Sequence, residues 1–333
     1  MLISKFASTE SAVTPLAKPM VDSAESLQLS VVIPVFEEEA TIGQLVAELV
    51  SSLSATSRSF EIVLVDDGSA DRTLEALGQL RGQFPDTVRV VSHLKNRGNG
   101  AALRTGIRVG KGSVVVTMDA DGQHSPADIA KLIARIPPYD LVIGARREGY
   151  RGALLRNLGN RFYNVFASWL TKTRIEDLTS GFRAMRRAAV DHFLPIFPEG
   201  FSAPTTTTMA FLKAGYNVAF VPISVRQRVA GKSKIHLWQD GARFVTIILR
   251  MIMLYDPLRI FLPAGAFLGA LGMAAWAAGI WNAGRLVVPN SAVFLFSAGL
   301  MTWLLGFISD QISSTRVQYH GDETLVEEGS DQI

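Results

Sequence analysis

Two long apolar runs without a single charge constrain the fold of this chain more than any other feature. The first, IFLPAGAFLGALGMAAWAAGIW, covers residues 260–281, and the second, SAVFLFSAGLMTWLLGFIS, covers residues 291–309. A helix needs roughly 20 apolar residues to cross the hydrocarbon core of a bilayer, and both runs have about that length. We therefore predict a transmembrane hairpin at 260–310. The alternative is a buried helical pair in a soluble core. Gly265 and Gly269 form a GxxxG pair, which favours close approach of the two helices.

The flanks of the hairpin predict its orientation. Residues 1–27 contain no continuous apolar stretch, so we expect a disordered tail without a leader peptide. Residues 237–259 are dense in apolar side chains and predict interfacial amphipathic helices, with a plain core helix as the alternative. Residues 311–333 read as a polar C-terminal tail. The link between the spans carries only Arg285, whereas three arginines precede the first span: Arg243, Arg250 and Arg259. This bias places the large polar region and both termini in the cytoplasm.

Composition excludes several classes of function. The formal net charge is only +3, which gives no argument for a nucleic-acid partner. The chain has no cysteine, so thiol catalysis, disulfides and thiolate metal sites are excluded.

Residues 28–236 alternate between strand-like and helix-like segments. Strands are expected at 29–36, 60–69, 88–94, 113–121 and 139–147, and helices at 41–53, 71–83, 98–110 and 125–136, the last with Ser125 as N-cap and Pro126 in its first turn. This alternation predicts an α/β fold, a mostly parallel sheet with helices on both faces. Ligands of such sheets bind beyond the carboxyl ends of the strands. Those ends carry Phe36–Glu39, Asp66–Asp67, Asp119–Asp121 and Arg146–Arg147.

The stretch MDADGQH at the end of the fourth predicted strand indicates a metal site. Asp119 and Asp121 are two residues apart, so on an extended chain both side chains point the same way. Such carboxylates suit a hard ion, Mg²⁺ or Mn²⁺, bound together with phosphate oxygens. An EF-hand is excluded because His124 stands where that loop needs glycine, and GIRVGKG is one residue short of a phosphate-binding P-loop.

Seven segments in register carry a family resemblance. The chain resembles the family 2 glycosyltransferases, and most closely their polyprenol-phosphate branch, which includes dolichol-phosphate mannose synthase and the bacterial undecaprenyl-phosphate sugar transferases. The resemblance covers residues 29–234 and implies a GT-A type catalytic domain that transfers a sugar from a nucleotide donor. The segments are VVIPVFEEEATI, EIVLVDDGSADRT, NRGNGAALRTGI, MDADGQH, IGARR, DLTSGFRAM and RVAGKSK.

The resemblance implies roles for residues on the donor side. Asp66 and Asp67 match an acidic pair that meets the base or ribose. The nucleotide-binding stretch departs from the family pattern, because Phe36 replaces a tyrosine and Glu37 an asparagine. The nucleotide-binding set is Pro34, Phe36, Glu38, Asp66, Asp67, Asp119 and Arg228, and the metal set is Asp119, Asp121 and Gln123.

The resemblance also implies roles on the acceptor side. Basic and polar side chains would meet the donor and acceptor phosphates, and Asp177 heads the DLTSGFR segment. The implied catalytic set is Asp121, Asp177, Arg146 and Arg183, and the acceptor-phosphate set is Arg146, Ser233 and Lys234. We interpret His124 as structural, and Arg147, Arg186 and Arg187 as surface or lipid-headgroup charges.

The implied reaction is inverting transfer from GDP-mannose or a UDP-hexose to a polyprenyl phosphate at the cytoplasmic membrane face. A phosphate acceptor is already anionic and needs no strong base, whereas a hydroxyl acceptor would need one, with Glu176 or Asp177 as candidates. Other readings are a processive polysaccharide synthase, a catalytically inactive membrane scaffold and a soluble nucleotidyltransferase. The first is disfavoured because the chain has no QxxRW stretch. The sequence leaves a homo-oligomer open.

Overall fold

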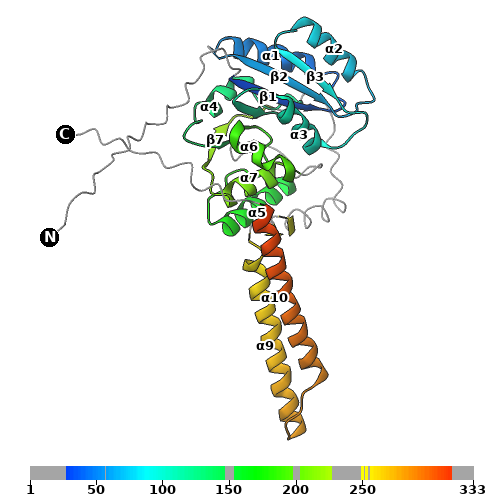
Figure 1. Cartoon of the computed structure of the whole chain (residues 1–333), viewed down its shortest axis with the longest axis vertical. Coiled ribbons are helices and arrows are strands. Elements are labelled where there is room, and N and C mark those ends of the chain that lie inside the picture. The colour runs from blue at the N-terminus through cyan, green and yellow to red at the C-terminus, as the bar shows by residue number, and fades with distance from the viewer. Residues whose placement is uncertain are drawn as a thin grey trace, which may run out of the picture.

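The computed structural model describes residues 28–56, 58–146, 154–197, 203–226, 249–250, 252–253 and 256–316. An α/β domain forms one end of the molecule, and two long helices project from it as a hairpin (Figure 1).

One sheet of seven strands organises the α/β domain. Its order is β3-β2-β1-β4-β6-β5-β7, and every neighbouring pair is parallel except those that involve β6. The mostly parallel sheet predicted from the sequence is confirmed. Its strands are β1 (Leu29–Val35), β2 (Phe60–Asp66), β3 (Val88–Ser92), β4 (Val114–Thr117), β5 (Leu141–Arg146), β6 (Arg183–Arg186) and β7 (Val218–Ile223).

Helices cover both faces of the sheet, also as predicted. One apolar cluster joins the sheet to α1, α2 and α4, and a second joins it to α3, α5, α6 and α7. The segment at 125–136 differs in detail, because it opens with a 3₁₀ turn (Pro126–Asp128) and Ser125 makes no side-chain cap. The helices are α1 (Ile42–Ser54), α2 (Thr73–Gln83), α3 (Asn99–Val109), α4 (Ile129–Ile133), α5 (Leu154–Thr171), α6 (Arg187–Phe193) and α7 (Ala203–Lys213).

Strand β6 determines what the sheet presents at its functional edge. It runs antiparallel to β4 on one side and to β5 on the other. Its first residue therefore lies at the edge where β4 and β5 end, which we call the rim. As a result, the segment 177–182 enters the rim between the Asp119 loop, which follows β4, and Arg146, which ends β5.

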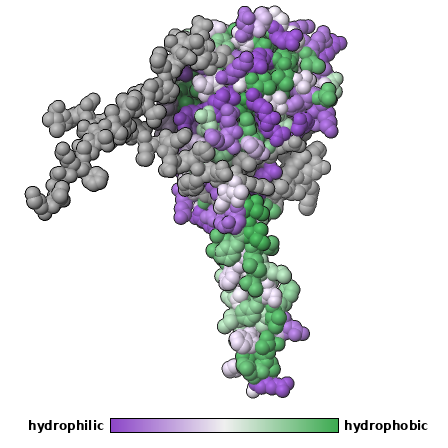
Figure 2. Space-filling model, in the orientation of Figure 1, coloured by the Kyte–Doolittle hydropathy of each residue, from purple (hydrophilic) through white to green (hydrophobic). Residues whose placement is uncertain are grey.

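The hairpin consists of α9 (Leu258–Ala283) and α10 (Asn290–Arg316), each longer than the apolar run that predicts it. At 1.5 Å per residue, the 26 residues of α9 extend about 39 Å, enough to cross a bilayer. Large apolar side chains point outward along both helices (Figure 2), with Phe267 64% and Phe294 72% exposed. The alternative of a buried pair in a soluble core is therefore wrong.

Small residues seven positions apart form the seam between the two helices. A Cβ atom on Gly265 would come within 2.9 Å of the Gly299 carbonyl oxygen, and one on Gly272 would meet the Phe296 ring at 3.2 Å. A Cβ on Gly269 would meet nothing within 4 Å. The Gly269 backbone nitrogen nevertheless lies 3.4 Å from where a Cβ on Gly299 would be, so the helices approach closely at both glycines, but only Gly265 directs its missing side chain into the contact. The spacing of the contacts is the heptad spacing typical of left-handed helix pairs.

This seam makes a matched pair of substitutions informative. We expect Gly265→Ala to destabilise the hairpin by about 1–3 kcal/mol, because the new methyl group would overlap the Trp303 ring and crowd the facing Gly299 carbonyl oxygen at 2.9 Å. Gly269→Ala gives the same gain in helix propensity without a clash, so it serves as the control. Thermal unfolding of the two full-length variants in detergent measures the difference, and equal melting temperatures would contradict the seam.

Candidate active site

The metal loop predicted from the sequence follows β4 at the rim. Asp121 Oδ1 accepts a hydrogen bond of 3.1 Å from the Gln123 N–H, and Gly122 forms the turn at φ 68°. Gly181 packs against Asp119 so closely that a Cβ there would lie 2.8 Å from Asp119 Oδ2. Asp119, Asp121 and Gln123 are therefore held on one short loop, backed by the segment 177–182.

The surroundings of Asp119 keep it ionised. Burial raises the pKa of its carboxyl group, but the His124 imidazole and the Arg146 and Arg183 guanidinium groups act more strongly, so that the pKa lies below its usual range. His124 Nε2 is 3.8 Å from Asp119 Oδ2, and its ring stacks on Phe182 at 5.1 Å. His124 is buried, in line with the structural role predicted for it.

The donor set fits a small divalent cation. Asp119 and Asp121 offer carboxylate oxygens and Gln123 an amide oxygen, which are ligands that Mg²⁺ and Mn²⁺ accept. Within the described ranges, no group of three or more His, Asp or Glu side chains forms a metal cage. A cation held here would accordingly share its coordination with phosphate oxygens and water, the usual arrangement for Mg²⁺.

Arg146 and Asp177 form the central ion pair of the rim. Arg146 Nε donates to Asp177 Oδ2 at 2.7 Å and Nη2 donates to Oδ1 at 2.8 Å, a bidentate arrangement. Arg146 Nη2 also donates to Thr179 Oγ1 at 2.6 Å. The Arg146 side chain is 32% exposed, whereas that of Asp177 is 7% exposed. Burial raises the pKa of Asp177, but the bonds from Arg146 outweigh it and the pKa is lowered, which makes Asp177 a poor base.

Arg183 lies beneath the 177–182 segment and does not face solvent. It is 2% exposed, and its guanidinium group donates to the Ser180 carbonyl, the Leu178 carbonyl and Thr208 Oγ1 at 2.7, 3.1 and 2.9 Å. Burial lowers its pKa to about 9, although Asp177 and Asp119 oppose this change. The geometry does not support the expected phosphate contact and indicates that Arg183 positions the segment above it.

The acidic pair at the end of β2, Asp66 and Asp67, is also buried. Asp67 accepts hydrogen bonds from His93 Nδ1 at 2.7 Å, from the Arg97 N–H at 3.0 Å and from the Gly98 N–H at 2.7 Å. Asp66 accepts bonds from the Ser69 N–H and the Ser92 hydroxyl. The two carboxylates therefore hold the loops that border the rim next to β1 and β2.

The segment after β1 is tied to the metal loop through Thr41. The Thr41 hydroxyl donates to Glu38 Oε2 at 2.7 Å and lies 3.3 Å from the Ala120 carbonyl oxygen. Phe36 is 40% exposed at the same edge, and Pro34 lies on β1. This part of the predicted nucleotide set is thus brought beside the predicted metal set.

Several predicted residues fall outside the described part of the chain, namely Arg228, Ser233, Lys234, Arg147 and most of 237–259. The nearest described residue is Arg226, whose N–H donates to the Gln123 carbonyl at 2.8 Å, while Val225 pairs with His124. The chain therefore reaches the metal loop two residues before Arg228.

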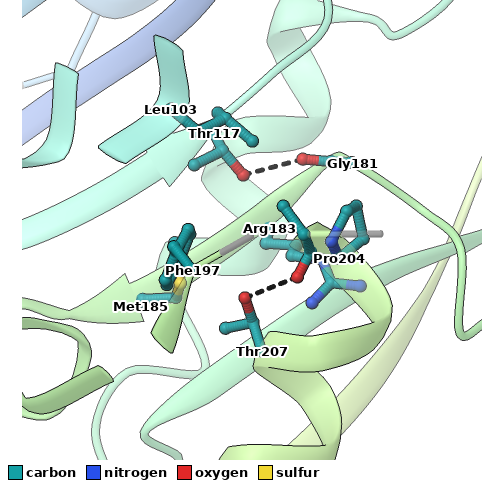
Figure 3. Close-up of a pocket in the computed structure, with 9 residues that line it drawn as sticks. Leu103, Thr117, Gly181, Arg183, Met185, Phe197, Pro204 and Thr207 are labelled. Atoms are coloured by element: carbon teal, nitrogen blue, oxygen red, sulfur yellow. Dashed lines mark hydrogen bonds between the residues drawn. The ribbon is translucent and has the colours of Figure 1, made fainter. Parts of the chain in front are cut away.

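A small pocket of about 10 Å³, roughly the space of one water molecule, lies next to Gly181 (Figure 3). The Thr117 hydroxyl donates to the Gly181 carbonyl, and the Thr207 hydroxyl donates to the Ala203 carbonyl. The four consecutive threonines of α7 are visible in the sequence, but the sequence alone assigns no role to any one of them. The lining residues are Leu103, Thr117, Gly181, Arg183, Met185, Phe197, Ala203, Pro204 and Thr207.

Comparisons with known proteins agree with this geometry. The family "Glycosyl transferase family 2" matches residues 30–194, and "GtrB C-terminal hairpin" matches residues 256–315. The undecaprenyl-phosphate 4-deoxy-4-formamido-L-arabinose transferase of Pseudomonas paraeruginosa is 28% identical over 85% of this chain and 84% of its own length. The dodecaprenyl-phosphate galacturonate synthase of Rhizobium johnstonii is 26% identical over 76% of this chain and 73% of its own length.

Solved structures show the same fold. Glucosyl-3-phosphoglycerate synthase from Mycobacterium tuberculosis, crystallised with Mn²⁺, UDP and phosphoglyceric acid, matches with a TM-score of 0.53 and 21% identity, over 68% of this chain and 77% of that one. A second crystal structure of that enzyme contains Mg²⁺ and UDP, with a TM-score of 0.52 and 22% identity over 68% of this chain and 78% of the other. The matched family, the hairpin and the fold together identify this chain as a membrane glycosyltransferase that belongs to family 2 and carries a GtrB-type C-terminal hairpin.

Proposed function

We propose that this enzyme transfers a sugar from a nucleotide-diphosphate sugar to a polyprenyl phosphate, with Mg²⁺ or Mn²⁺ and with inversion at the anomeric carbon, at the cytoplasmic face of the membrane. The observation that carries the proposal is the juxtaposition of an anionic metal loop and a partly exposed arginine at one rim of a domain joined to a membrane hairpin. The names of the relatives, which act on undecaprenyl and dodecaprenyl phosphate, point to the same acceptor class.

In this proposal the rim divides into a donor side and an acceptor side. The metal ion would be held by Asp119, Asp121 and Gln123 and would neutralise charge that grows on the departing diphosphate. Arg146, fixed in orientation by Asp177, would attract the acceptor phosphate through its exposed edge. The remaining assignments are Pro34, Phe36, Glu38, Asp66, Asp67 and Arg228 at the nucleotide, and Ser233 and Lys234 at the acceptor phosphate.

The state of Asp177 favours a phosphate acceptor over a hydroxyl. A hydroxyl acceptor needs a base whose pKa is close to the working pH. The pKa of Asp177 is lowered by its bonds from Arg146, so Asp177 is a weak base at neutral pH. A phosphate oxygen is anionic without help, and the site then needs to supply only orientation and positive charge.

A transfer assay tests the proposal. The detergent-solubilised protein is incubated with labelled UDP-glucose, UDP-N-acetylglucosamine or GDP-mannose, together with undecaprenyl phosphate and Mn²⁺. We expect label from one donor to enter the organic phase, and chelation to stop it. Label that enters the organic phase at an equal rate in the presence of chelator would contradict the metal role. Donor binding without transfer to the lipid phosphate would move the acceptor to a hydroxyl and make Glu176 the first residue to replace.

A further inference from the structure

One asparagine on helix α5 holds the backbone of the active-site segment around Asp177. Asn164 Nδ2 donates to the Glu176 carbonyl at 2.7 Å, and Asn164 Oδ1 accepts from the Leu178 N–H at 3.0 Å. These bonds clamp the backbone on either side of Asp177, the partner of Arg146. The position of α5 therefore determines where that ion pair lies.

The other end of α5 is attached to the first hairpin helix. Arg259, in the first turn of α9, donates through Nη1 to the Leu170 carbonyl at 2.6 Å, and its guanidinium carbon lies 4.3 Å from the centre of the Trp169 ring. A carbonyl in the last turn of a helix has no partner within that helix and carries partial negative charge, so an arginine is a favourable partner for it. The cation–π contact adds to this attachment.

Helix α7 makes the same connection to the second hairpin helix. Thr208, in the middle of α7, accepts from Arg183, which supports the 177–182 segment from below. Lys213, the last residue of α7, donates through Nζ to the hydroxyl of Ser313. Ser313 is 1% exposed near the end of α10. Burial lowers the pKa of Lys213, while the nearby negative charges of Asp310 and Asp256 act in the opposite direction.

From these contacts we infer that Arg259 and Lys213 are positioning residues, which fix the orientation of the catalytic rim relative to the bilayer so that a membrane-embedded lipid phosphate reaches Arg146. Two attachments on two different helices prevent rotation of the domain, which a single flexible tether would allow. The inference rests on the proposed function, because it assumes an acceptor whose phosphate lies at the membrane surface. Removing the attachments leaves the rim itself intact, since Asn164, Asp177 and Arg183 keep their bonds.

The test compares two acceptors on one reconstituted protein. The full-length variant Lys213→Met/Arg259→Gln is placed in lipid vesicles and given either undecaprenyl phosphate in the bilayer or farnesyl phosphate, a short-chain acceptor supplied from solution. We expect kcat/KM for undecaprenyl phosphate to fall about tenfold, and kcat/KM for farnesyl phosphate to stay within about twofold. Arg285→Gln, which removes an arginine from the opposite end of the hairpin, is the matched control and should change neither value.

A second measurement does not depend on activity. Because the chain has no cysteine, the substitutions Asp191→Cys on α6 and Leu271→Cys on α9 accept one spin label each, and both positions are exposed. The distance distribution between the labels should be narrow in the parent protein and broad in the double variant. If the double variant does not fold, Ser313→Ala removes a single hydroxyl and should give a smaller version of both changes.

The outcomes separate this inference from the proposed function. Equal losses with both acceptors, unchanged rates with both, or an unbroadened distance distribution would each overturn the positioning role. If the parent protein transfers sugar to neither acceptor, the proposed function fails. The label distances then decide alone whether Arg259 and Lys213 hold the domain in place.

Discussion

Asp121→Asn should reduce transfer by about a thousandfold, and Asp119→Asn by at least as much. Asparagine keeps the shape of the side chain but replaces an anionic ligand with a neutral amide, so a divalent cation binds more weakly and neutralises less charge on the departing diphosphate. The measurement is kcat at saturating donor across a Mn²⁺ titration. Asp86→Asn, which neutralises an exposed acid between α2 and β3, is the matched control and should retain full activity.

The two metal-loop variants should differ in a way that reflects their surroundings. Asp121 bonds to the backbone of its own loop, whereas Asp119 is also packed against Gly181 and lies beside His124. Excess Mn²⁺ should therefore recover more activity in Asp121→Asn than in Asp119→Asn. An Asp121→Asn enzyme with the Mn²⁺ dependence and kcat of the parent would show that the loop does not hold the metal.

Arg146→Met should be the most damaging single change outside the metal loop, lowering transfer by about a hundredfold and the free energy of unfolding by about 3 kcal/mol. The stability loss arises because the substitution leaves the buried Asp177 carboxylate without its bidentate partner. Asp177→Asn should cost only about 1 kcal/mol, since it leaves a partly exposed guanidinium group that water can solvate. Thermal unfolding in detergent and steady-state transfer rates measure the two effects.

Lowering the pH should reduce the loss of stability caused by Arg146→Met. In the parent protein the pKa of Asp177 is lowered, so the ion pair contributes stability at neutral pH, and that contribution is lost as the pH falls through the lowered value. Without the Arg146 guanidinium group, burial is opposed mainly by the backbone N–H groups of residues 146 and 179, so the pKa of Asp177 is higher than in the parent and protonation costs less as the pH falls. The difference in stability between the parent and Arg146→Met should therefore shrink as the pH falls from neutral toward the lowered pKa of the parent. A constant difference would mean that Asp177 is solvated in the variant.

The features that sequence predicted well depend on local pattern. Each apolar run is long enough to span a bilayer by itself, so the hairpin could be recognised from composition alone. The ends of the strands can also be predicted from local pattern. The structure confirms that Asp119, just after β4, and Arg146, the last residue of β5, lie at the same rim. The placement of β6 between them could not be read, because its short, polar sequence RAMR pairs with strands far away in the chain.

The features that sequence missed depend on partners distant in the chain. The interpretation as surface or headgroup charges is wrong for Arg187, which is 19% exposed and donates to the Gly112 and Ile107 carbonyls. It is incomplete for Arg186, whose side chain is 40% exposed but pairs with the buried Asp140. Arg183 likewise finds Thr208, 25 residues later. An arginine alone does not show whether its partner is a phosphate, a carboxylate or a carbonyl oxygen. The site residues of the rim therefore remain predictions until the substitutions above are made.

The place of β6 in the sheet also determines the order in which the strands can join the sheet while the chain is being synthesised. Strands β1 to β4 form a contiguous unit that is complete by Thr117, but β5 and β7 join it only after β6, which ends at Arg186, has been synthesised. The sheet ends at Ile223 and α9 begins at Leu258, so the ribosome needs about two to seven seconds between the two at typical rates of elongation. The catalytic domain can therefore assemble while the chain is still attached to the ribosome, before membrane insertion of the hairpin begins.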